Sequence, residues 1–195
     1  PAVFDWSAVM ARKDDVIKEF ADYRAGQLNS GKFDLIRTQA RFLDPHTVDL
    51  GNGRRLTAAH FVIGTGSVVG PAPLPELNQV GYLDSDAALD LKELPKSLVI
   101  LGGGAIAVEF AQLFARFDVD VTLVQRSEQL LKDFDPDAAA AVESSFRREG
   151  IKVLTGTQLL GARREASKKG ISFLQGGRKQ EVFKSTRLIA HSFVF

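Results

Sequence analysis

The sequence predicts an α/β fold in which a parallel sheet covered by helices is followed by an antiparallel meander. Residues 97–154 read as strand, helix, strand, helix and strand in turn, an order typical of a parallel sheet. Three glycines at 102–104 separate the first of these strands from the first helix. Beyond residue 155, short strand-like stretches are divided by turns, which favours antiparallel pairing.

Residues 1–69 are expected to form a separate part of the molecule. Apolar residues at steps of three and four predict one helix over 5–28, which the sequence Asn29-Ser30-Gly31 ends. Gly51-Asn52-Gly53 predicts a hairpin between short strands. Residues 61–63 predict a buried strand that ends in Gly64-Thr65-Gly66.

The stretch GPAPLP, residues 70–75, fits neither a helix nor a central strand because of its prolines and its glycine. We therefore expect a linker over 70–84 between one domain at 1–69 and a second at 85–195. Asp84 or Ser85 is expected to cap a short helix that runs to Leu94, where Pro95 stops it.

The second domain has the clearest signals. We expect strands at 97–101, 119–125 and 151–154, a helix at 104–117, and a helix capped by Asp135 and ended by Gly150. Turns expected at Lys168-Lys169-Gly170 and at Gly176-Gly177 divide the meander, and its last strand is expected in the sequence RLIA, residues 187–190.

Composition excludes several classes of function. A net charge of +1 does not favour nucleic acid or an anionic membrane as a partner. No apolar run approaches the roughly 20 residues of a membrane-spanning helix. The chain has no cysteine, which removes disulfides, thiolate metal sites and a cysteine nucleophile. Because neither an initiator methionine nor a signal peptide is found, we expect a piece of a longer protein, with the cytoplasm as the default location.

The glycines predict a dinucleotide site. Gly102, Gly104 and Ala107 form the pattern G-x-G-x-x-A, which permits a tight turn, a close approach to a pyrophosphate and close packing of helix on strand. The helix that opens at Ala105 and Ile106 offers free N–H groups to the phosphates. The strand–turn–helix context supports this interpretation. The alternative is a tight turn that holds no ligand.

The end of the second strand indicates which dinucleotide is bound. A site for NAD carries an acid there, about 20 residues after the glycines, but this chain has Gln125 followed by Arg126. A guanidinium pairs well with a 2′-phosphate, Ser127 adds a hydrogen-bond donor, and Lys132 follows after a short loop. The sequence therefore favours NADPH over NADH. Ordinary solvated surface charges at Arg126 and Lys132 remain the alternative.

These motifs resemble those of the FAD-dependent pyridine nucleotide–disulfide oxidoreductases, which include dihydrolipoamide dehydrogenase, glutathione reductase and mercuric reductase. GGGAIAVEFAQLFARF is similar to their NAD(P) fingerprint, and VTLVQRSEQLL is most similar to the mercuric-reductase-like branch. The resemblance implies a Rossmann-type NAD(P) domain, preceded by the C-terminal part of an FAD domain. In glutathione reductase two basic residues six apart clamp the 2′-phosphate, and Arg126 and Lys132 match that spacing.

The resemblance also implies residues that contact FAD. RTQARF is similar to the strand whose backbone meets the FAD adenine, which places Ala40 there, and IGTGS is similar to the segment that closes the FAD domain, which places Thr65 and Gly66 there. Full members of the family begin with a second glycine fingerprint and a redox-active C-x4-C, and end in a dimerisation domain with a catalytic His-Glu pair. This chain has none of these, so we expect an internal fragment of a homodimeric parent, with no catalytic residue of its own.

Glu109 follows the fingerprint, and the resemblance places it near the nicotinamide, which it orients toward the flavin. The alternative is a carboxylate in the first turn that the helix dipole favours. His46, His60 and His191 have no metal or nucleophile spacing around them, so surface or strand-packing roles are expected. Helix capping explains Asp133, Asp135 and Asp137 better than a cation loop does.

Three hypotheses for the function remain open. The first is a flavoprotein oxidoreductase, seen as a fragment, that passes hydride from NADPH to FAD and on to a disulfide or metal ion, with an NAD-linked dihydrolipoamide dehydrogenase as its variant. The second is a dinucleotide-binding module without catalysis, and the third is a structural protein. Apolar residues that would pack against a missing half also predict self-association. They are Val9, Ile17, Phe20, Phe61, Val62 and Ile63.

Overall fold

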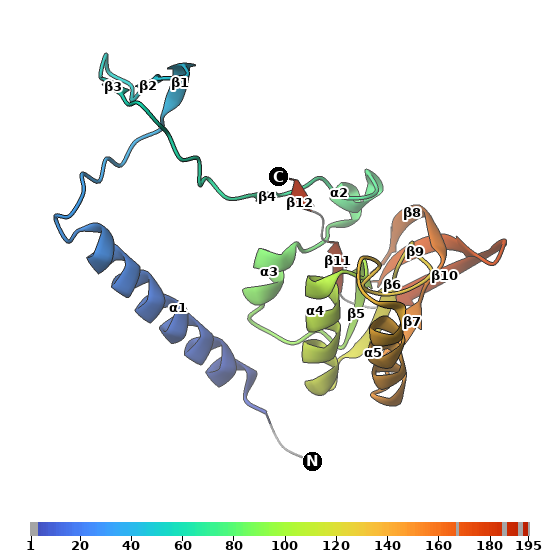
Figure 1. Ribbon diagram of the computed structural model, residues 1–195. Helices are drawn as coiled ribbons and strands as arrows, with labels where there is room; N and C mark the ends of the chain where they lie inside the picture. The colour runs from blue at the N-terminus through green and yellow to red at the C-terminus, as the bar shows by residue number, and fades with distance from the viewer. Residues whose placement is uncertain (1–3, 167, 185–186, 191–192, 195) are drawn as a thin grey trace. The chain divides into compact units, whose positions relative to one another are not determined.

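The computed structural model describes residues 4–166, 168–184, 187–190 and 193–194. The chain forms two compact units, Pro1–Ser7 with Ser67–Phe195 and Ala8–Gly66, and each is described by itself. No helix in the described ranges is long and apolar enough to cross a membrane. The fold class is the predicted one, with a parallel sheet, covering helices and an antiparallel meander (Figure 1).

The larger unit is built on a four-stranded parallel sheet in the order β11-β5-β6-β7. Its strands are β5 (Ser97–Leu101), β6 (Asp120–Val124), β7 (Lys152–Leu154) and β11 (Arg187–Ala190). The helices α4 (Ala105–Arg116) and α5 (Pro136–Arg148) connect β5 to β6 and β6 to β7. The predicted strands and helices over residues 97–154 are confirmed to within a residue or two at each end.

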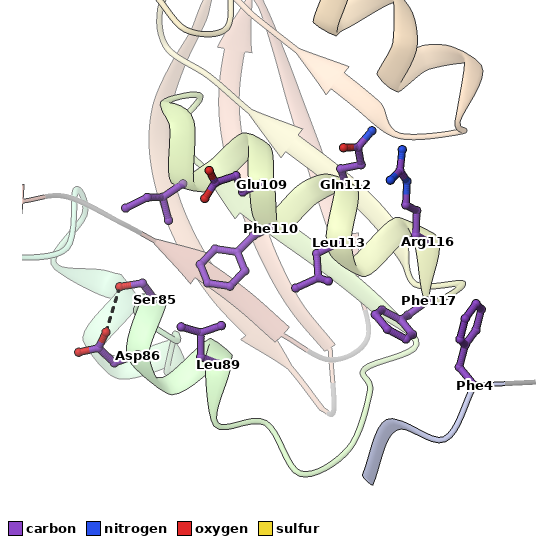
Figure 2. A pocket seen from close by; sticks show the side chains of 11 residues that line it. Phe4, Ser85, Asp86, Leu89, Glu109, Phe110, Gln112, Leu113, Arg116 and Phe117 are labelled. Carbon is purple, nitrogen blue, oxygen red and sulfur yellow. Dashed lines mark hydrogen bonds between the residues drawn. The ribbon is translucent and has the colours of Figure 1, made fainter. Parts of the chain in front are cut away.

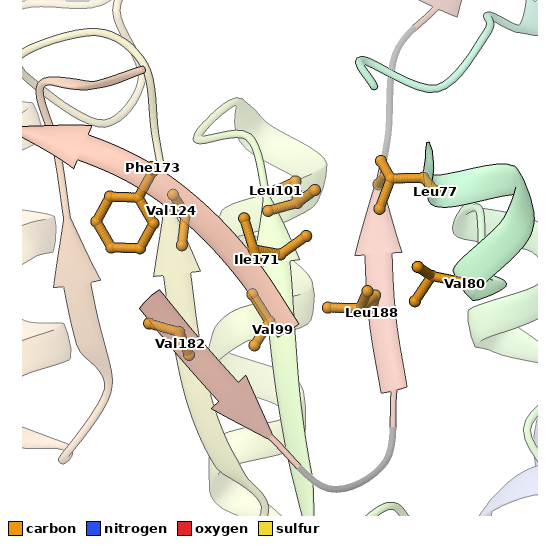
Figure 3. Close-up of a cluster of buried hydrophobic side chains, with 10 residues drawn as sticks. Leu77, Val80, Val99, Leu101, Val124, Ile171, Phe173, Val182 and Leu188 are labelled. Carbon is orange, nitrogen blue, oxygen red and sulfur yellow. The ribbon is translucent and has the colours of Figure 1, made fainter. Parts of the chain in front are cut away.

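The meander of β8 (Thr157–Glu165), β9 (Lys168–Gln175) and β10 (Arg178–Lys184) packs on one face of this sheet (Figure 3). Ile171, Phe173 and Val182 meet Val99 and Val124 there. The helix α2 (Glu76–Val80) lies in the segment expected as a linker, and its Leu77 and Val80 complete this core. Because both faces of β5 are covered, all five of its residues are buried.

Two expectations for the meander are wrong. β11 pairs in parallel with β5, Arg187 opposite Leu98, so residues 187–190 belong to the parallel sheet. The turn expected at Lys168-Lys169-Gly170 lies earlier, near Ala166, whose φ is 52°, and β9 already begins at Lys168. Gly170 lies inside β9 and not in a turn. A glycine is needed there because a Cβ would lie 2.6 Å from the ring of Phe183. The turn at Gly176-Gly177 is confirmed, with positive φ at both residues.

The short helix α3 (Ser85–Leu89) is capped by Asp84, whose side chain accepts a hydrogen bond from the backbone N–H of Ala87 at 2.8 Å. It ends at Leu89 and not at the expected Leu94. Leu91 is buried, and its carbonyl accepts a hydrogen bond from the indole Nε1 of Trp6 at 2.9 Å. A strand pair, β4 (Val68–Val69) with β12 (Phe193–Val194), completes the larger unit.

The smaller unit contains most of α1 (Trp6–Leu28) and a sheet of β1 (Arg41–Asp44), β2 (Thr47–Asp49) and β3 (Arg55–Thr57). The helix and the hairpin turn at 51–53 are confirmed, and all three turn residues have positive φ. Residues 61–63, expected as a buried strand, have no regular structure, and Val62 is 97% exposed. Within the described ranges no strand pairs with them; the ring of Phe61 packs edge-on against Phe42 at 5.0 Å.

Candidate functional site

The glycine-rich turn joins β5 to α4. Gly102 has a φ of 114°, which favours glycine, and its N–H donates to the carbonyl of Val124 at 2.9 Å. Gly104 is the N-cap of α4 and provides no side-chain cap. The N–H of Val108 bonds the carbonyl of Gly104, so the first-turn N–H groups have no partner inside the helix. A Cβ built on Gly104 would meet nothing within 4 Å, which leaves this helix end open to a ligand.

Gly103, which the sequence pattern did not single out, is the most tightly enclosed of the three glycines. A Cβ on it would lie 2.9 Å from Cγ and Cδ of Gln125 and from Cδ2 of Leu130. Gln125 is only 8% exposed, and its Oε1 accepts the backbone N–H of Arg126 at 3.0 Å. Gln125, at the position where an NAD site carries an acid, therefore packs against the glycine turn. The run of three glycines was the available signal for this close contact.

The loop that follows β6 is tied back to the glycine turn. The N–H of Leu131, whose φ is 49°, donates to the carbonyl of Gly103 at 2.6 Å. The N–H of Leu130 donates to Oε1 of Glu143 on α5 at 2.9 Å, and Oε2 of Glu143 pairs with Arg147 at 3.0 Å. The bonds made by Leu131 and Leu130 join separate elements and hold the loop between the glycine turn and α5.

A cavity of about 290 Å³ lies between the glycine turn and this loop. We call it the glycine cavity. It brings together six predicted site residues, which are Gly104, Ala105, Gln125, Arg126, Ser127 and Lys132. Gly103, Leu131, Asp133 and Phe134 line it as well, and none of these four was predicted. Gly102 and Ala107 are not in its lining; Ala107 is buried where α4 packs on the sheet.

The glycine cavity carries two cationic side chains. Among the described residues the guanidinium of Arg126 makes no hydrogen bond or ion pair, and the side chain is exposed. Nζ of Lys132 lies 3.9 Å from a carboxylate oxygen of Asp133, with both side chains more than half exposed. Such an exposed pair is weak, so both cations are available to an anion.

Ile106 and Glu109 line a different cavity, of about 870 Å³, beside α3 and α4 (Figure 2). We call it the apolar cavity. Phe110 and Leu113 of α4 point toward Leu89 of α3 across it. Glu109 is exposed at its edge and has no partner among the described residues. It is the fifth residue of α4, and the first turn contains no acid, so the alternative of a first-turn carboxylate favoured by the helix dipole is wrong.

The far end of the apolar cavity is polar and already paired. Arg116 Nε lies 3.3 Å from Oε2 of Glu149, and Gln112 donates to Oε1 of Glu149 at 2.9 Å. The hydrogen bonds from Gln112 and then Arg116 lower the pKa of Glu149 below its ordinary value. Glu109 is therefore the acid in the lining that is left for a ligand, beside Asp86, which bonds Ser85 at 3.5 Å.

The three residues expected near FAD belong to the smaller unit. Ala40 directly precedes β1, and Thr65 and Gly66 follow the irregular segment after β3. All three are exposed, and Gly66 has a φ of 74°. None lines the glycine cavity or the apolar cavity.

The remaining candidates are three histidines and an aspartate cluster. His46 lies in the turn after Asp44, which accepts its N–H at 2.7 Å, and His60 is exposed; His191 lies outside the described residues. Oδ1 of Asp135 accepts the N–H groups of Asp137 and Ala138 at 2.8 and 3.4 Å, so capping by Asp135 is confirmed. In the described ranges no group of three or more His, Cys, Asp or Glu side chains is placed to hold a metal ion.

Comparison with known proteins identifies similar chains. Mercuric reductase of Staphylococcus aureus is 36% identical over 158 residues, which are 81% of this chain and 29% of that protein. Dihydrolipoyl dehydrogenase of Thermus scotoductus is 34% identical over 192 residues, covering 95% and 41% of the two chains. The chain thus spans less than half the length of these relatives.

A solved structure with the same fold is the HOCl-induced flavoprotein disulfide reductase RclA from Escherichia coli. It superposes with a TM-score of 0.81 and 26% identity, over 97% of this chain and 43% of that one. The family model for pyridine nucleotide-disulphide oxidoreductases matches residues 5–190, which include the whole smaller unit, most of the larger one and the whole lining of the glycine cavity. The resemblance predicted from the motifs is confirmed, and this chain belongs to the pyridine nucleotide-disulphide oxidoreductase family.

Proposed function

We propose that this chain binds NADPH in the glycine cavity and is the dinucleotide-binding part of a flavoprotein oxidoreductase. The whole protein would pass hydride from NADPH to FAD and on to a disulfide or a metal-ion substrate. The family match supports the reaction class, and relatives named mercuric reductase and flavoprotein disulfide reductase support the two substrate classes.

One observation carries the NADPH assignment: the glycine cavity joins an uncapped helix N-terminus to an unpaired guanidinium. The free N–H groups of α4 and its dipole favour a pyrophosphate at Gly104. Arg126 and Lys132 then lie in the lining where a 2′-phosphate gains charge-assisted hydrogen bonds. The buried Gln125 has no carboxylate to repel that phosphate.

Glu109 is proposed to position the nicotinamide. It stands exposed at the edge of the apolar cavity, whose walls suit a flat ring with little charge. A single unpaired carboxylate on such a wall fixes the orientation of a ring that carries an amide. This role rests on the family resemblance and on the place of Glu109 on α4.

FAD is proposed as a cofactor of the whole protein, where it would accept hydride from NADPH. Ala40, Thr65 and Gly66 fit a contact through exposed backbone, and the positive φ of Gly66 suits a close approach. Three residues are too few to hold FAD, so we propose that further polypeptide would complete the site. The sequence has no cysteine, so a redox-active pair would also come from outside this chain, which alone is expected to be inactive.

Two alternatives have support of their own. The dihydrolipoyl dehydrogenase of T. scotoductus aligns with 95% of the chain, which favours an NAD-linked enzyme of that kind. The second alternative is a dinucleotide-binding module without catalysis, for which the glycine cavity alone would be enough. The choice of dinucleotide separates the first alternative from the proposal.

The test is calorimetric titration of the chain with NADPH and then NADH. We expect NADPH to bind more tightly, with the difference reduced by salt because it depends on exposed charges. Replacing Arg126→Glu should weaken NADPH binding about ten- to hundredfold, since hydrogen bonds to charged groups contribute about 1.5–3 kcal/mol, and should leave NADH binding nearly unchanged.

Arg178→Glu provides the matched control. Arg178 is equally exposed, makes no hydrogen bond or ion pair among the described residues, and begins β10 in the meander. The Arg178→Glu substitution changes the net charge by the same amount as Arg126→Glu, but Arg178 does not line the glycine cavity. Equal loss of NADPH affinity in both variants, or no loss in Arg126→Glu, would reject the phosphate clamp and reopen the NAD-linked alternative.

A further inference from the structure

Phe134 is an exposed aromatic residue in the lining of the glycine cavity. Its side chain is 61% exposed, whereas Phe110, Phe114, Phe146 and Phe173 in the same unit are at most 6% exposed. It is also the one aromatic side chain among the described residues that line the glycine cavity. An exposed phenyl ring leaves a large apolar area in water, and a flat ligand that covers it gains free energy.

The backbone around Phe134 is fixed from both sides. Its N–H donates to the carbonyl of Leu131 at 2.8 Å, and Leu131 is itself bonded to Gly103. Its carbonyl accepts a hydrogen bond from the side chain of Gln129 at 3.4 Å, and the next residue, Asp135, caps α5. The ring is therefore held at the cavity by a loop that is ordered before any ligand binds, which lowers the entropic cost of using it.

A local structural role accounts for part of this arrangement. Phe134 precedes the N-cap of α5, and Ala139 is the fourth residue of the helix, so the two occupy the positions of a hydrophobic staple. Ala139 is fully buried. A staple would cover part of the ring, but Phe134 remains 61% exposed. The two roles are separable, because a staple affects stability and a binding surface affects affinity.

We propose that Phe134 is the platform on which the adenine ring of the bound dinucleotide stacks. The inference rests on the proposed function. Adenine and the 2′-phosphate are carried by the same ribose, so adenine must lie within one sugar of the cations that bind the phosphate. Phe134 is two residues from Lys132 and lines the same cavity. Proteins that bind single-stranded nucleic acids stack bases on aromatic side chains, and every base has a face that suits such stacking.

This role predicts a pattern of selectivity different from that of Arg126. NADPH and NADH carry the same adenine, so removing the ring should weaken both by the same factor. Removing the Arg126 charge should weaken NADPH alone. The two residues therefore contribute independently, one to affinity for adenine and the other to the choice between dinucleotides.

The experiment is calorimetric titration of the full chain with NADPH, NADH and adenosine 2′,5′-bisphosphate, which contains only the adenine half. Phe134→Ala should weaken all three about tenfold, within the range known for loss of one base–aromatic stack. Phe134→Tyr, which keeps the ring face, should bind all three as the unmodified chain does. Phe33→Ala, at an aromatic residue 52% exposed in the smaller unit, is the control and should change nothing.

Unchanged affinity in Phe134→Ala would overturn the platform, as would failure of Phe134→Tyr to retain binding. A lower melting temperature in Phe134→Ala with all affinities intact would leave only the staple. Failure of the unmodified chain to bind any dinucleotide would overturn this inference together with the proposed function. Equal binding of NADPH and NADH, both weakened by Phe134→Ala, would reject the 2′-phosphate clamp and keep the platform.

Discussion

Two buried threonines differ in whether the hydroxyl group has a partner. Thr122 on β6 is fully buried, and within the described ranges its Oγ1 has no hydrogen-bond partner. Thr157 at the start of β8 is 3% exposed, and its Oγ1 donates to the carbonyl of Gln125 at 2.9 Å. A buried hydroxyl without a partner costs free energy, whereas one that is bonded makes a small net contribution to stability.

The same substitution at these two positions should therefore have opposite effects. Thr122→Val should raise the free energy of unfolding by about 1 kcal/mol, because a methyl group replaces an unpaired hydroxyl of similar size. Thr157→Val should lower it by about 1 kcal/mol, because the Gln125 carbonyl loses a donor. Urea denaturation of both variants measures this. A loss of stability in Thr122→Val would show that its hydroxyl has a partner after all.

Single residues also show why the site was only partly predictable. Gly104, Arg126 and Lys132 were found because a local pattern and their side-chain chemistry point to a dinucleotide. Gly103 and Phe134 were not predicted. The close approach of Gly103 to Gln125 and the position of the loop before Phe134 both depend on contacts between segments distant in sequence. For Gly103 the run of three glycines was the one local signal, and Phe134 has no comparable local pattern.

The C-terminal end of α2 is held by cations from the meander. Arg164 on β8 donates to the carbonyl of Val80 at 3.1 Å, and Nζ of Lys169 on β9 donates to the carbonyl of Gly81 at 2.5 Å. Lys169 is among the buried polar residues. Burial, followed by repulsion from Arg164 and Arg187, lowers the pKa of Lys169 below its ordinary value of 10.5.

This lowered pKa makes stability depend on pH in a defined direction. Between the folded-state pKa of Lys169 and 10.5, the unfolded chain binds more protons than the folded chain, so stability from this group rises as pH rises. Lys169→Met should remove that increase, seen as a flatter dependence of the unfolding free energy on pH in the alkaline range below 10.5. Lys168→Met, at the exposed neighbour, should keep the slope of the unmodified chain; the same slope in Lys169→Met would contradict the assignment.

Whole elements were predictable where local signals agreed with one another. Over residues 97–154 the capping residues, the apolar periodicity and the glycine breaks all indicate the same boundaries, and the structure follows them. The sequence RLIA looks like any short strand, and its parallel pairing with β5 depends on a partner far away in sequence. Gly170 looks like a turn residue, but it is placed by the Phe183 ring of the neighbouring strand.

At the scale of the molecule, the smaller unit exposes most of its apolar side chains. On α1 the described side chains other than Trp6 are at least partly exposed, including Ile17 at 56% and Phe20 at 67%. Val62 and Ile63 are 97% and 71% exposed. Surfaces of this kind mark sites that are covered by further protein or that associate.

We therefore expect the chain to self-associate. Sedimentation velocity should show a weight-average mass that rises with concentration, and the double variant Phe20→Ser, Val62→Ser should reduce the rise. Leu160→Ser, which removes an apolar side chain that is 42% exposed on the meander, should not. A monomer at every concentration would show that the exposed residues do not drive association.

The parallel pairing of β11 with β5 has a consequence for how the chain folds. Leu98 of β5 pairs with Arg187, so α4, α5 and the whole meander lie between the two partners in sequence. During synthesis β5 emerges long before β11, and one of its edges stays open until residues 187–190 arrive. Closing so long a loop is slow, and an open strand edge favours pairing with the wrong chain. The yield of folded protein should therefore depend on how fast β11 pairs with β5. It should depend less on the stability of the glycine turn between β5 and α4.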